Sequence, residues 1–328
     1  MSTLPPVAGD LADELTALLG QIPSGRVTTY GALARALGDV AAARWVGEFL
    51  LRHDHTDGCP CHRVVRAGGE VGRFVTGEVQ EKQALLEAEG VGVQNGRADV
   101  SRVFVGFQSI APLKRLKEFQ DTVPGRLTRR PSGRRIETVA AIDVAYVSPG
   151  DAVGACVLVD RGSLETIWST TVRAAARFPY IPGYLAFREL GVMLAVWQAV
   201  AESGHRADLV LIDGNGILHP RRAGIASCFG LLAGVPSIGI GKKLLCGRVE
   251  LEGMSAGDDR PVLHDDELVG AAIKCGPNSR PIFVSPGNQI GVAGAVRLVR
   301  ELFDEHRLPE PLHRADRLSK DEARRLKT

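Results

Sequence analysis

RFPYIPGYLAFRE, residues 177–189, decides the expected fold together with two acidic positions, one before it and one after it. Asp143 interrupts ETVAAIDVAYV and Asp213 ends ADLVLID, and both runs are apolar with β-branched residues, which predicts buried strands. Glu189 lies in LAFRELGVMLAVWQAVAE, whose length and apolar spacing predict a helix. Burying a carboxylate is costly unless a cation lies beside it. Two strands and a helix therefore supply three carboxylates of the kind that bind hard divalent cations.

Three such carboxylates suit the hydrolysis of phosphodiester bonds, because divalent cations can clamp the attacking and leaving oxygens. The alternative for each residue alone is structural, since an aspartate at a strand end is often a turn former or helix cap. The presence of all three favours a metal site with Asp143, Glu189 and Asp213 as its ligands.

The order of the predicted elements in this part of the chain is that of an α/β fold. Three consecutive strands are predicted from about residue 137 to 174, and alternating helices and strands follow. A meander followed by helix–strand alternation favours a mixed sheet with flanking helices. The last helix is expected in GVAGAVRLVRELF, residues 291–303.

Four motifs follow one another here: FPYIPGYLAFREL, DGNGILHPRRAGIAS, PSIGIGKKLLCG and PIFVSPGNQI. Their sequence and order resemble the endonuclease V family, and the resemblance runs from about Ile110 to the C-terminus. It implies an RNase H-like fold and Mg²⁺ as cofactor, with Mn²⁺ as the alternative. It also implies that the substrate is nucleic acid containing hypoxanthine, which is nicked on the 3′ side of the lesion. Asp143 and Asp213 would hold the metal, with Glu189 as a third ligand or just outside the ligands.

The same resemblance implies further roles. A strand-separating wedge would be carried by Tyr180, Ile181 and Pro182. Lys242 would neutralise phosphate charge, and His219 and Arg221 would line the site. The structural alternatives are an ordinary Pro-Gly turn with an exposed tyrosine, and a surface lysine.

Asn288 departs from the family pattern, which usually has histidine after SPG. Asparagine cannot accept a proton near neutral pH, whereas histidine can position or deprotonate a water. We therefore expect slower cleavage, and a higher rate at neutral pH in Asn288→His.

Size and composition place the chain among ordinary globular proteins of about two domains, with 328 residues, 45% apolar and 24% charged. No apolar run is long enough to span a bilayer, and MSTLPPVAGDLADEL lacks the pattern of a secretory signal, so a cytoplasmic protein is expected. The six cysteines are too sparse for a disulfide scaffold. With a net charge of +2, affinity for DNA must come from local basic patches.

One such patch is predicted in TVPGRLTRRPSGRR, residues 122–135. Its arginines could contact phosphate, or they could form an ordinary solvated surface. They are Arg126, Arg129, Arg130, Arg134 and Arg135.

The N-terminal part predicts short helices. RVTTYGALARALG, residues 26–38, has Thr28 or Thr29 as a helix cap and Gly38 as a stop, and AAARWVGEFLLRH follows after a short turn. This is the pattern of a helix-turn-helix, which can enter a groove of DNA. A plain helical pair is the alternative.

HDHTDGCPCHRVV, residues 53–65, places Cys61 beside His62 and Arg63. Cationic neighbours favour the thiolate, which is the nucleophilic form. A metal cluster is a second interpretation, although Cys-x-Cys is tighter than the usual zinc pairs. Its ligands would be His53, His55, Cys59, Cys61 and His62. A purely structural cysteine is the third.

Four motifs in this part of the chain resemble the C-terminal domain of alkylguanine-DNA alkyltransferases. In order, they are IPSGRVTTYGALA, AAARWVG, PCHRVV and LLEAEGV. The resemblance implies that Cys61 accepts the alkyl group from guanine O6, that His62 relays a proton and that Glu89 orients His62. Tyr30 would crowd the phosphate of a flipped nucleotide, and Arg44 would fill the vacated stack. The chain departs from the family where His53-Asp54 replaces Asn-Pro and Phe74-Val75-Thr76 replaces Tyr-Ser-Gly.

The sequence thus predicts a two-domain α/β repair protein. Residues 1–107 would form a helix-turn-helix, winged-helix-like alkyltransferase domain, and residues 108–328 an RNase H-like endonuclease V domain. The expected partner is damaged DNA carrying alkylated guanine or hypoxanthine, with no membrane and no obligate protein partner. The alternatives are a non-catalytic lesion sensor at the N-terminus, a nuclease acting on inosine in RNA, and a structural zinc site at Cys59 and Cys61.

Overall fold

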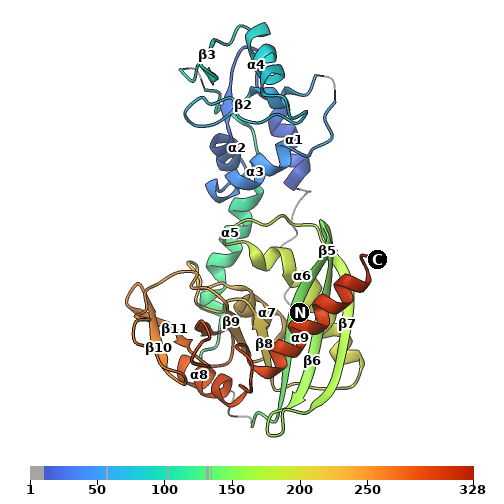
Figure 1. Cartoon of the computed structure of the whole chain (residues 1–328), viewed down its shortest axis with the longest axis vertical. Coiled ribbons are helices and arrows are strands. Elements are labelled where there is room, and N and C mark those ends of the chain that lie inside the picture. Colours follow the sequence, from blue (N-terminus) through green and yellow to red (C-terminus); the bar gives the residue numbers. More distant parts are fainter. Residues whose placement is uncertain (1–10, 57, 102, 131–132, 134) are drawn as a thin grey trace. The chain divides into compact units, whose positions relative to one another are not determined.

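The computed structural model describes residues 11–56, 58–101, 103–130, 133 and 135–328 (Figure 1). These residues divide into two compact units, a larger one of 119–179 and 183–328 and a smaller one of 11–118 and 180–182. Helix α5 (Pro112–Thr122) contains the division, whereas the sequence suggested a boundary after residue 107. Arg134 of the predicted basic patch lies outside the described residues.

The smaller unit is built from short helices and two small strand pairs. Thr29 caps α2, because its hydroxyl accepts a hydrogen bond from the Ala32 amide at 3.1 Å, while Thr28 donates to the Phe104 carbonyl. The 3₁₀ turn Val40–Ala42 joins α2 to α3, in agreement with the expected helix-turn-helix order. The elements are α1 (Leu11–Gly20), α2 (Tyr30–Ala36), α3 (Ala43–Leu50), α4 (Val79–Ala88), parallel β1 (Thr28–Thr29) and β2 (Val64–Val65), and antiparallel β3 (Val93–Gln94) and β4 (Arg97–Ala98).

The larger unit is organised by one eight-stranded sheet in the order β10-β11-β12-β9-β8-β5-β6-β7. The meander β5-β6-β7 is antiparallel, and β5, β8 and β9 run parallel in the centre. The strands are β5 (Thr138–Ser148), β6 (Gly150–Asp160), β7 (Thr166–Ala176), β8 (Leu209–Asp213), β9 (Ser237–Gly241), β10 (Asp259–His264), β11 (Glu267–Ile273) and β12 (Ile282–Pro286).

Helices cover both faces of this sheet. On β5, Ala140 and Ile142 pack against α6 and α7, whereas Val139 and Ala141 pack on the side of α8 and α9. The alternation follows from the two-residue period of a strand that is buried on both faces. The helices are α6 (Leu185–Glu202), α7 (Ile225–Ala233), α8 (Val292–Glu301) and α9 (Glu310–Arg325). The predicted mixed α/β sheet with flanking helices is confirmed.

In the larger unit, strand β10 and helix α9 were not predicted. The sequence placed the last helix at residues 291–303, but that segment is α8, and α9 follows it and packs across β5 and β6 (Figure 1). The inner face of α9 is formed largely by small residues, Ala315, Ser319 and Ala323, in a sequence otherwise dominated by charge. No helix among the described residues has both the length and the apolar character needed to cross a membrane.

Candidate functional site

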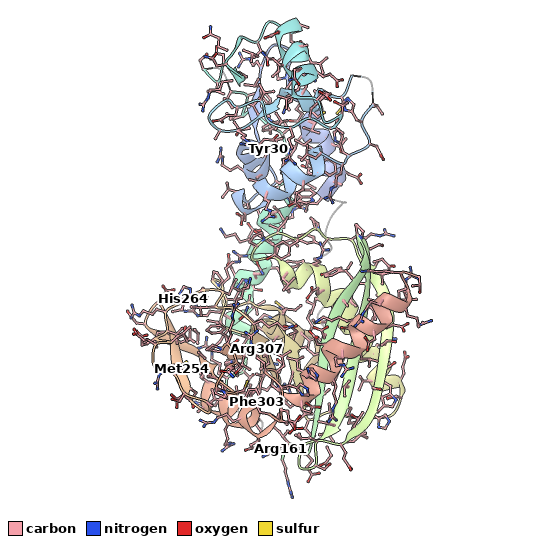
Figure 2. All side chains as sticks on the ribbon, in the orientation of Figure 1. Tyr30, Arg161, Met254, His264, Phe303 and Arg307 are labelled. Carbon is pink, nitrogen blue, oxygen red and sulfur yellow. The ribbon has the colours of Figure 1, made fainter. Side chains whose placement is uncertain are left out.

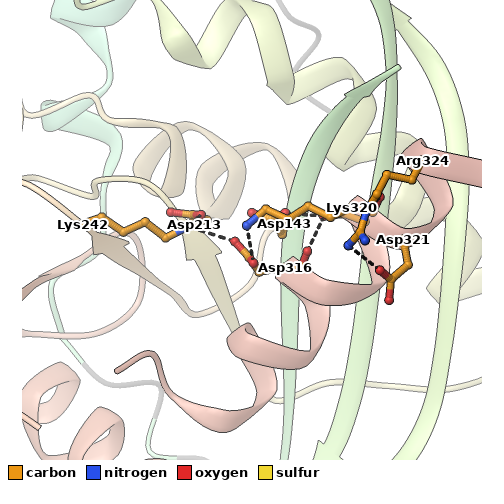
Figure 3. Close-up of polar contacts among 8 residues, drawn as sticks. Asp143, Asp213, Lys242, Asp316, Lys320, Asp321 and Arg324 are labelled. Carbon is orange, nitrogen blue, oxygen red and sulfur yellow. Dashed lines mark hydrogen bonds and ion pairs between the residues drawn. The ribbon is translucent and has the colours of Figure 1, made fainter. Parts of the chain in front are cut away.

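Three aspartates meet at one end of the central strands. Residues 139–142 of β5 pair in parallel with 209–212 of β8, so Asp143 and Asp213 follow paired positions on adjacent strands. Helix α9 brings Asp316 to the same place. One carboxylate oxygen from each of the three lies within 4.8 Å of the others (Figure 3).

Cationic and hydroxyl groups hold these carboxylates. Lys242 Nζ lies 2.5 Å from Asp213 Oδ2 and 3.0 Å from Asp316 Oδ1 (Figure 3). Lys320 Nζ donates to the other oxygen of Asp316 at 2.5 Å. Together with residues of α9, Asp143, Asp213 and Lys242 line an open cleft of about 430 Å³.

The electrostatics of the cluster differ from residue to residue. Burial, followed by the charge of Asp213, raises the pKa of Asp143 to about 8. Burial also opposes ionisation of Asp316, but hydrogen bonds from Lys320 and Lys242 outweigh it and hold the pKa of Asp316 below its ordinary value. Asp143 is thus the aspartate of this cluster that has no cationic partner at hydrogen-bond distance among the described residues.

Lys242 is itself fixed through its backbone. The guanidinium of Arg307, which is labelled in Figure 2, donates to the carbonyls of Lys242 and Pro281 at 2.9 and 3.0 Å. Burial opposes the charge on Lys242, but Asp213 and Asp316 outweigh it and raise its pKa above the ordinary value. The lysine is thus a fixed positive charge at the edge of the carboxylate cluster.

Glu189 lies outside the cluster of three. It is buried on α6, and Tyr146 donates a 2.6 Å hydrogen bond to its Oε1. Burial raises the pKa of Glu189 to about 7, and the charge of Asp213 acts in the same direction. The sequence expected Asp143 and Asp213 as ligands, with Glu189 as a third ligand or just outside them, and the group within 4.8 Å joins Asp143 and Asp213 to Asp316.

In the smaller unit, Cys61 lies in the 3₁₀ turn Pro60–Arg63 and is buried. His62 Nε2 lies 3.1 Å from Glu89 Oε1, as expected for a glutamate that orients this histidine. Arg63 also binds Glu89, through Nε at 2.9 Å and Nη2 at 2.6 Å. Burial opposes ionisation of Glu89, but hydrogen bonds from Arg63 and His62 lower its pKa to about 2.

Burial favours the neutral form of the Cys61 thiol. Burial, followed by the neighbouring Cys59, raises the pKa of Cys61 to about 12. Lys82 is buried close by and donates to the carbonyls of Val64 and Val71 at 2.6 and 2.7 Å. Its charge favours the Cys61 thiolate, but burial and Cys59 act more strongly.

Both parts of the chain match known protein families. Residues 122–317 match the family model for endonuclease V. The chain belongs to the endonuclease V family. Residues 10–91 match the model for the DNA-binding domain of 6-O-methylguanine DNA methyltransferase. The chain is therefore a fusion of an endonuclease V with a methyltransferase domain of the DNA-repair type.

Relatives include both the fusion and the nuclease alone. A bifunctional methyltransferase/endonuclease of Picrophilus torridus is 40% identical over 299 residues, which cover 90% of this chain and 92% of the relative. An endonuclease V of Azotobacter vinelandii is 40% identical over 61% of this chain and 90% of its own length. The solved endonuclease V of Streptomyces avermitilis is 32% identical, with a TM-score of 0.60 over 66% of this chain and 94% of that structure.

In this endonuclease V chain, the PYIP segment is a fixed turn. Tyr180 is 64% exposed, whereas Ile181 is 1% exposed. Gly183 follows with φ at 82°, and its carbonyl accepts hydrogen bonds from Gln120 and Arg221 at 2.9 and 3.0 Å. Of the predicted wedge residues, Tyr180 and Pro182 are exposed and Ile181 is buried.

Arg221 and His219 support this turn. Arg221 donates from Nε and Nη2 to Gln120 Oε1, and its guanidinium lies 5.1 Å from the centroid of the Tyr184 ring. His219 is buried, and its Nδ1 accepts from the Arg221 amide at 3.1 Å. Burial, followed by the charge of Arg221, lowers the pKa of His219 to about 4. Neither residue lines the carboxylate cleft, so the structure gives both of them positioning contacts.

Asn288 is committed to structural hydrogen bonds. Its Oδ1 accepts from the Thr128 amide at 3.0 Å and its Nδ2 donates to the Gly230 carbonyl at 2.9 Å. It is buried and does not line the carboxylate cleft. The sequence suggested residue 288 only as the place of a histidine that could act on a water, whereas these contacts give Asn288 a structural role.

Of the remaining predicted contacts with DNA, Arg44 and Tyr30 lie in the smaller unit and the basic patch lies in the larger one. Arg44 is largely exposed and pairs with Glu48 at 3.1 Å on the same helix. Tyr30 begins α2 and is half-buried, and burial raises its pKa. In the predicted basic patch, Arg129 pairs with Glu267 and Arg135 with Glu137.

Proposed function

We propose that the larger unit nicks nucleic acid on the 3′ side of hypoxanthine, with Mg²⁺ or alternatively Mn²⁺ held by Asp143, Asp213 and Asp316. The observation that carries this proposal is the convergence of three carboxylates within 4.8 Å in an open cleft. The donor set fits, because carboxylate oxygens are the ligands that these hard cations prefer. Burial, followed by the charge of Asp213, raises the pKa of Asp143, and a bound cation would favour its ionised form.

When bound, the cation would lower the pKa of a water and stabilise charge on the leaving oxygen. The residues of the chain would orient the substrate around it. Lys242, at the edge of the cluster, would neutralise the phosphodiester charge. The exposed ring of Tyr180 would stack on a base next to the lesion. Glu189, just outside the ligands, would hold Tyr146 and the start of α6 in place.

The test is a nicking assay on a duplex with one hypoxanthine, with and without Mg²⁺. Asp143→Ala and Asp316→Asn should each remove activity, whereas Asp321→Asn on the same helix, which pairs with Arg324 at the surface, should retain it. Equal activity of Asp316→Asn and Asp321→Asn would refute the ligand set. A matched strand with inosine in RNA decides between DNA and RNA as the preferred substrate.

We also propose that the smaller unit transfers an alkyl group from guanine O6 to Cys61. The Cys61 Sγ–carbon bond forms as the carbon–O6 bond breaks, the electron pair passes to the guanine, and the guanine takes up the proton that the thiol releases. What supports this is the pair formed by His62 and Glu89 beside Cys61. Mass spectrometry after incubation with O6-methylguanine DNA should find a methyl group on Cys61. Binding without this adduct would instead identify a lesion sensor.

A further inference from the structure

Four sulfur and nitrogen ligands gather around the loop between α3 and the Cys61 turn. His53 follows α3, with its amide bonded to the Phe49 carbonyl at 2.8 Å, and His55 comes two residues later. A turn closed by the Cys59 amide and the Thr56 carbonyl at 3.0 Å brings the chain back. As a result, one ligand atom from each of His53, His55, Cys59 and Cys61 lies within 4.8 Å of the others.

Two of the ligand–ligand distances match those of a tetrahedral site. His53 Nε2 lies 3.3 Å from Cys59 Sγ, and His55 Nδ1 lies 3.5 Å from Cys61 Sγ. A tetrahedral zinc ion with bonds of about 2.0–2.3 Å to nitrogen and sulfur requires ligand–ligand separations of about 3.3–3.8 Å. The two nitrogen–sulfur pairs therefore already have the spacing of two edges of such a tetrahedron.

The histidine rings are oriented independently of the sulfur atoms. His53 Nδ1 lies 3.1 Å from the Leu50 carbonyl, which fixes the proton on Nδ1 and leaves the lone pair of Nε2 facing Cys59. A second nitrogen that donates to a backbone carbonyl is the usual arrangement of a metal-binding histidine. Phe49 stacks on His53, and Phe74 packs edge-on against His55.

We propose that His53, His55, Cys59 and Cys61 bind one thiophilic divalent cation, Zn²⁺, in a tetrahedral site with two sulfur and two nitrogen ligands. Soft thiolates with imidazoles select zinc over magnesium and calcium, which take oxygen ligands. His62, a fifth ligand candidate in the sequence, is directed to Glu89 instead. The exposed side of His55 leaves an entry path for the ion.

Zinc binding would give Cys61 a second role, that of a metal ligand. Zinc binds thiolates, so binding would release the thiol protons of Cys59 and Cys61. The sulfur proposed to accept an alkyl group would then be a metal ligand, and zinc and the alkylated base would compete for it. The zinc site rests on the four ligands alone and does not depend on whether Cys61 transfers alkyl groups.

Cobalt titration of the reduced, metal-free, full-length protein tests the site. Co²⁺ should give a thiolate-to-cobalt charge-transfer band that saturates at one equivalent and disappears when Zn²⁺ is added. Cobalt at the aspartate cluster gives no such band, because its ligands are oxygens. Cys59→Ser with Cys61→Ser should abolish the band, and Cys246→Ser, which changes a cysteine of the larger unit, should leave it intact. Absence of the band in the wild type would overturn the proposal, as would its survival in the double variant.

A second measurement needs no variant and so does not depend on folding of the substituted chain. Alkylation of each cysteine by iodoacetamide is followed by mass spectrometry with and without Zn²⁺. Cys59 and Cys61 should become protected together, at least tenfold, while Cys246 and Cys275 react at unchanged rates. Equal rates for Cys59 with and without zinc would show that the contacts are hydrogen bonds between thiols and imidazoles and nothing more.

Discussion

Ser319 Oγ on the last helix donates a 2.5 Å hydrogen bond to Asp143 Oδ2 on the first strand of the sheet. The two residues are 176 positions apart, and both are buried. The same helix supplies Asp316 one turn earlier, so α9 contributes both a candidate ligand and the hydroxyl that orients another. The carboxylate cluster therefore depends on the packing of the C-terminal helix as much as on the central strands.

Ser319→Ala should slow nicking about tenfold at pH 7 and make it more dependent on pH. A hydrogen bond to a charged group contributes about 1.5–3 kcal/mol, so its loss should raise the pKa of Asp143 further above the ordinary value. Because the ionised form is needed for cation binding, activity at low Mg²⁺ should recover as pH rises. The measurement is a pH profile of nicking at subsaturating Mg²⁺. Ser163→Ala, in the turn after β6, serves as the control, and an unshifted profile for Ser319→Ala would contradict the prediction.

Lys242→Met should reduce the maximal nicking rate and also reduce the Mg²⁺ concentration needed to reach it. The rate should fall roughly a hundredfold, as expected when one preorganised group that stabilises phosphoryl charge is removed. The Mg²⁺ requirement should fall because the Lys242 ammonium contacts oxygens of Asp213 and Asp316 and so competes with a cation. The measurement is the Mg²⁺ dependence of nicking, with the exposed neighbour Lys243→Met as the control. The competition argument fails if the Mg²⁺ dependence is unchanged.

Part of this site could be predicted from the sequence for a simple reason. Asp143 and Asp213 interrupt or end apolar runs, so their burial and their nearness follow from strand pairing. Asp316 could not be found in this way. It lies in RADRLSKDE, where frequent charges suggest a solvent-exposed face, and the residues that pack α9 on the sheet are small. Only the tertiary position of α9 shows that this aspartate faces the strands.

Other differences between the sequence-based predictions and the structure also arise from tertiary contacts. The sequence could not show that Ile181 is buried while Tyr180 is exposed, because both occur in a proline-rich turn without a period. Likewise, the Cys59-x-Cys61 spacing suggested too tight a pair for a metal, but the fold adds His53 and His55 across a turned loop. In each case the deciding contact is made between segments that no local pattern relates.

Asn288→His should destabilise the larger unit by about 1–3 kcal/mol, the cost of leaving buried polar groups unpaired. The Thr128 amide and the Gly230 carbonyl would lose their partners, and a larger ring would have to fit a buried position. No gain in nicking rate at neutral pH is expected. The measurement is denaturant unfolding followed by Trp168 and Trp197 fluorescence in a Trp45→Phe background. Asn278→His, in an exposed loop, is the control, and a faster enzyme of unchanged stability would restore the original expectation for residue 288.

Glu89→Gln should destabilise the smaller unit by about 2–3 kcal/mol at pH 7, since it removes the charge from the hydrogen bonds to Arg63 and His62. The pKa of Glu89 is lowered from 4.5 to about 2, so the folded state favours the ionised form. The stabilising effect is therefore fully present above about pH 4.5 and is lost as the pH falls towards 2. The difference between wild type and Glu89→Gln should accordingly be large at pH 7, reduced at pH 3 and smallest at pH 2 and below.

Denaturant unfolding followed by Trp45 fluorescence, with Trp168 and Trp197 replaced by phenylalanine, measures the free energy of unfolding of this unit alone. Glu87→Gln is the control on the same stretch of chain, because Glu87 is exposed and its side chain bonds only to Gln83 among the contacts described. If Glu89→Gln and Glu87→Gln lose the same stability at pH 7, or if the effect of Glu89→Gln persists undiminished at pH 3, the Arg63–Glu89–His62 arrangement does not stabilise the fold through its charge.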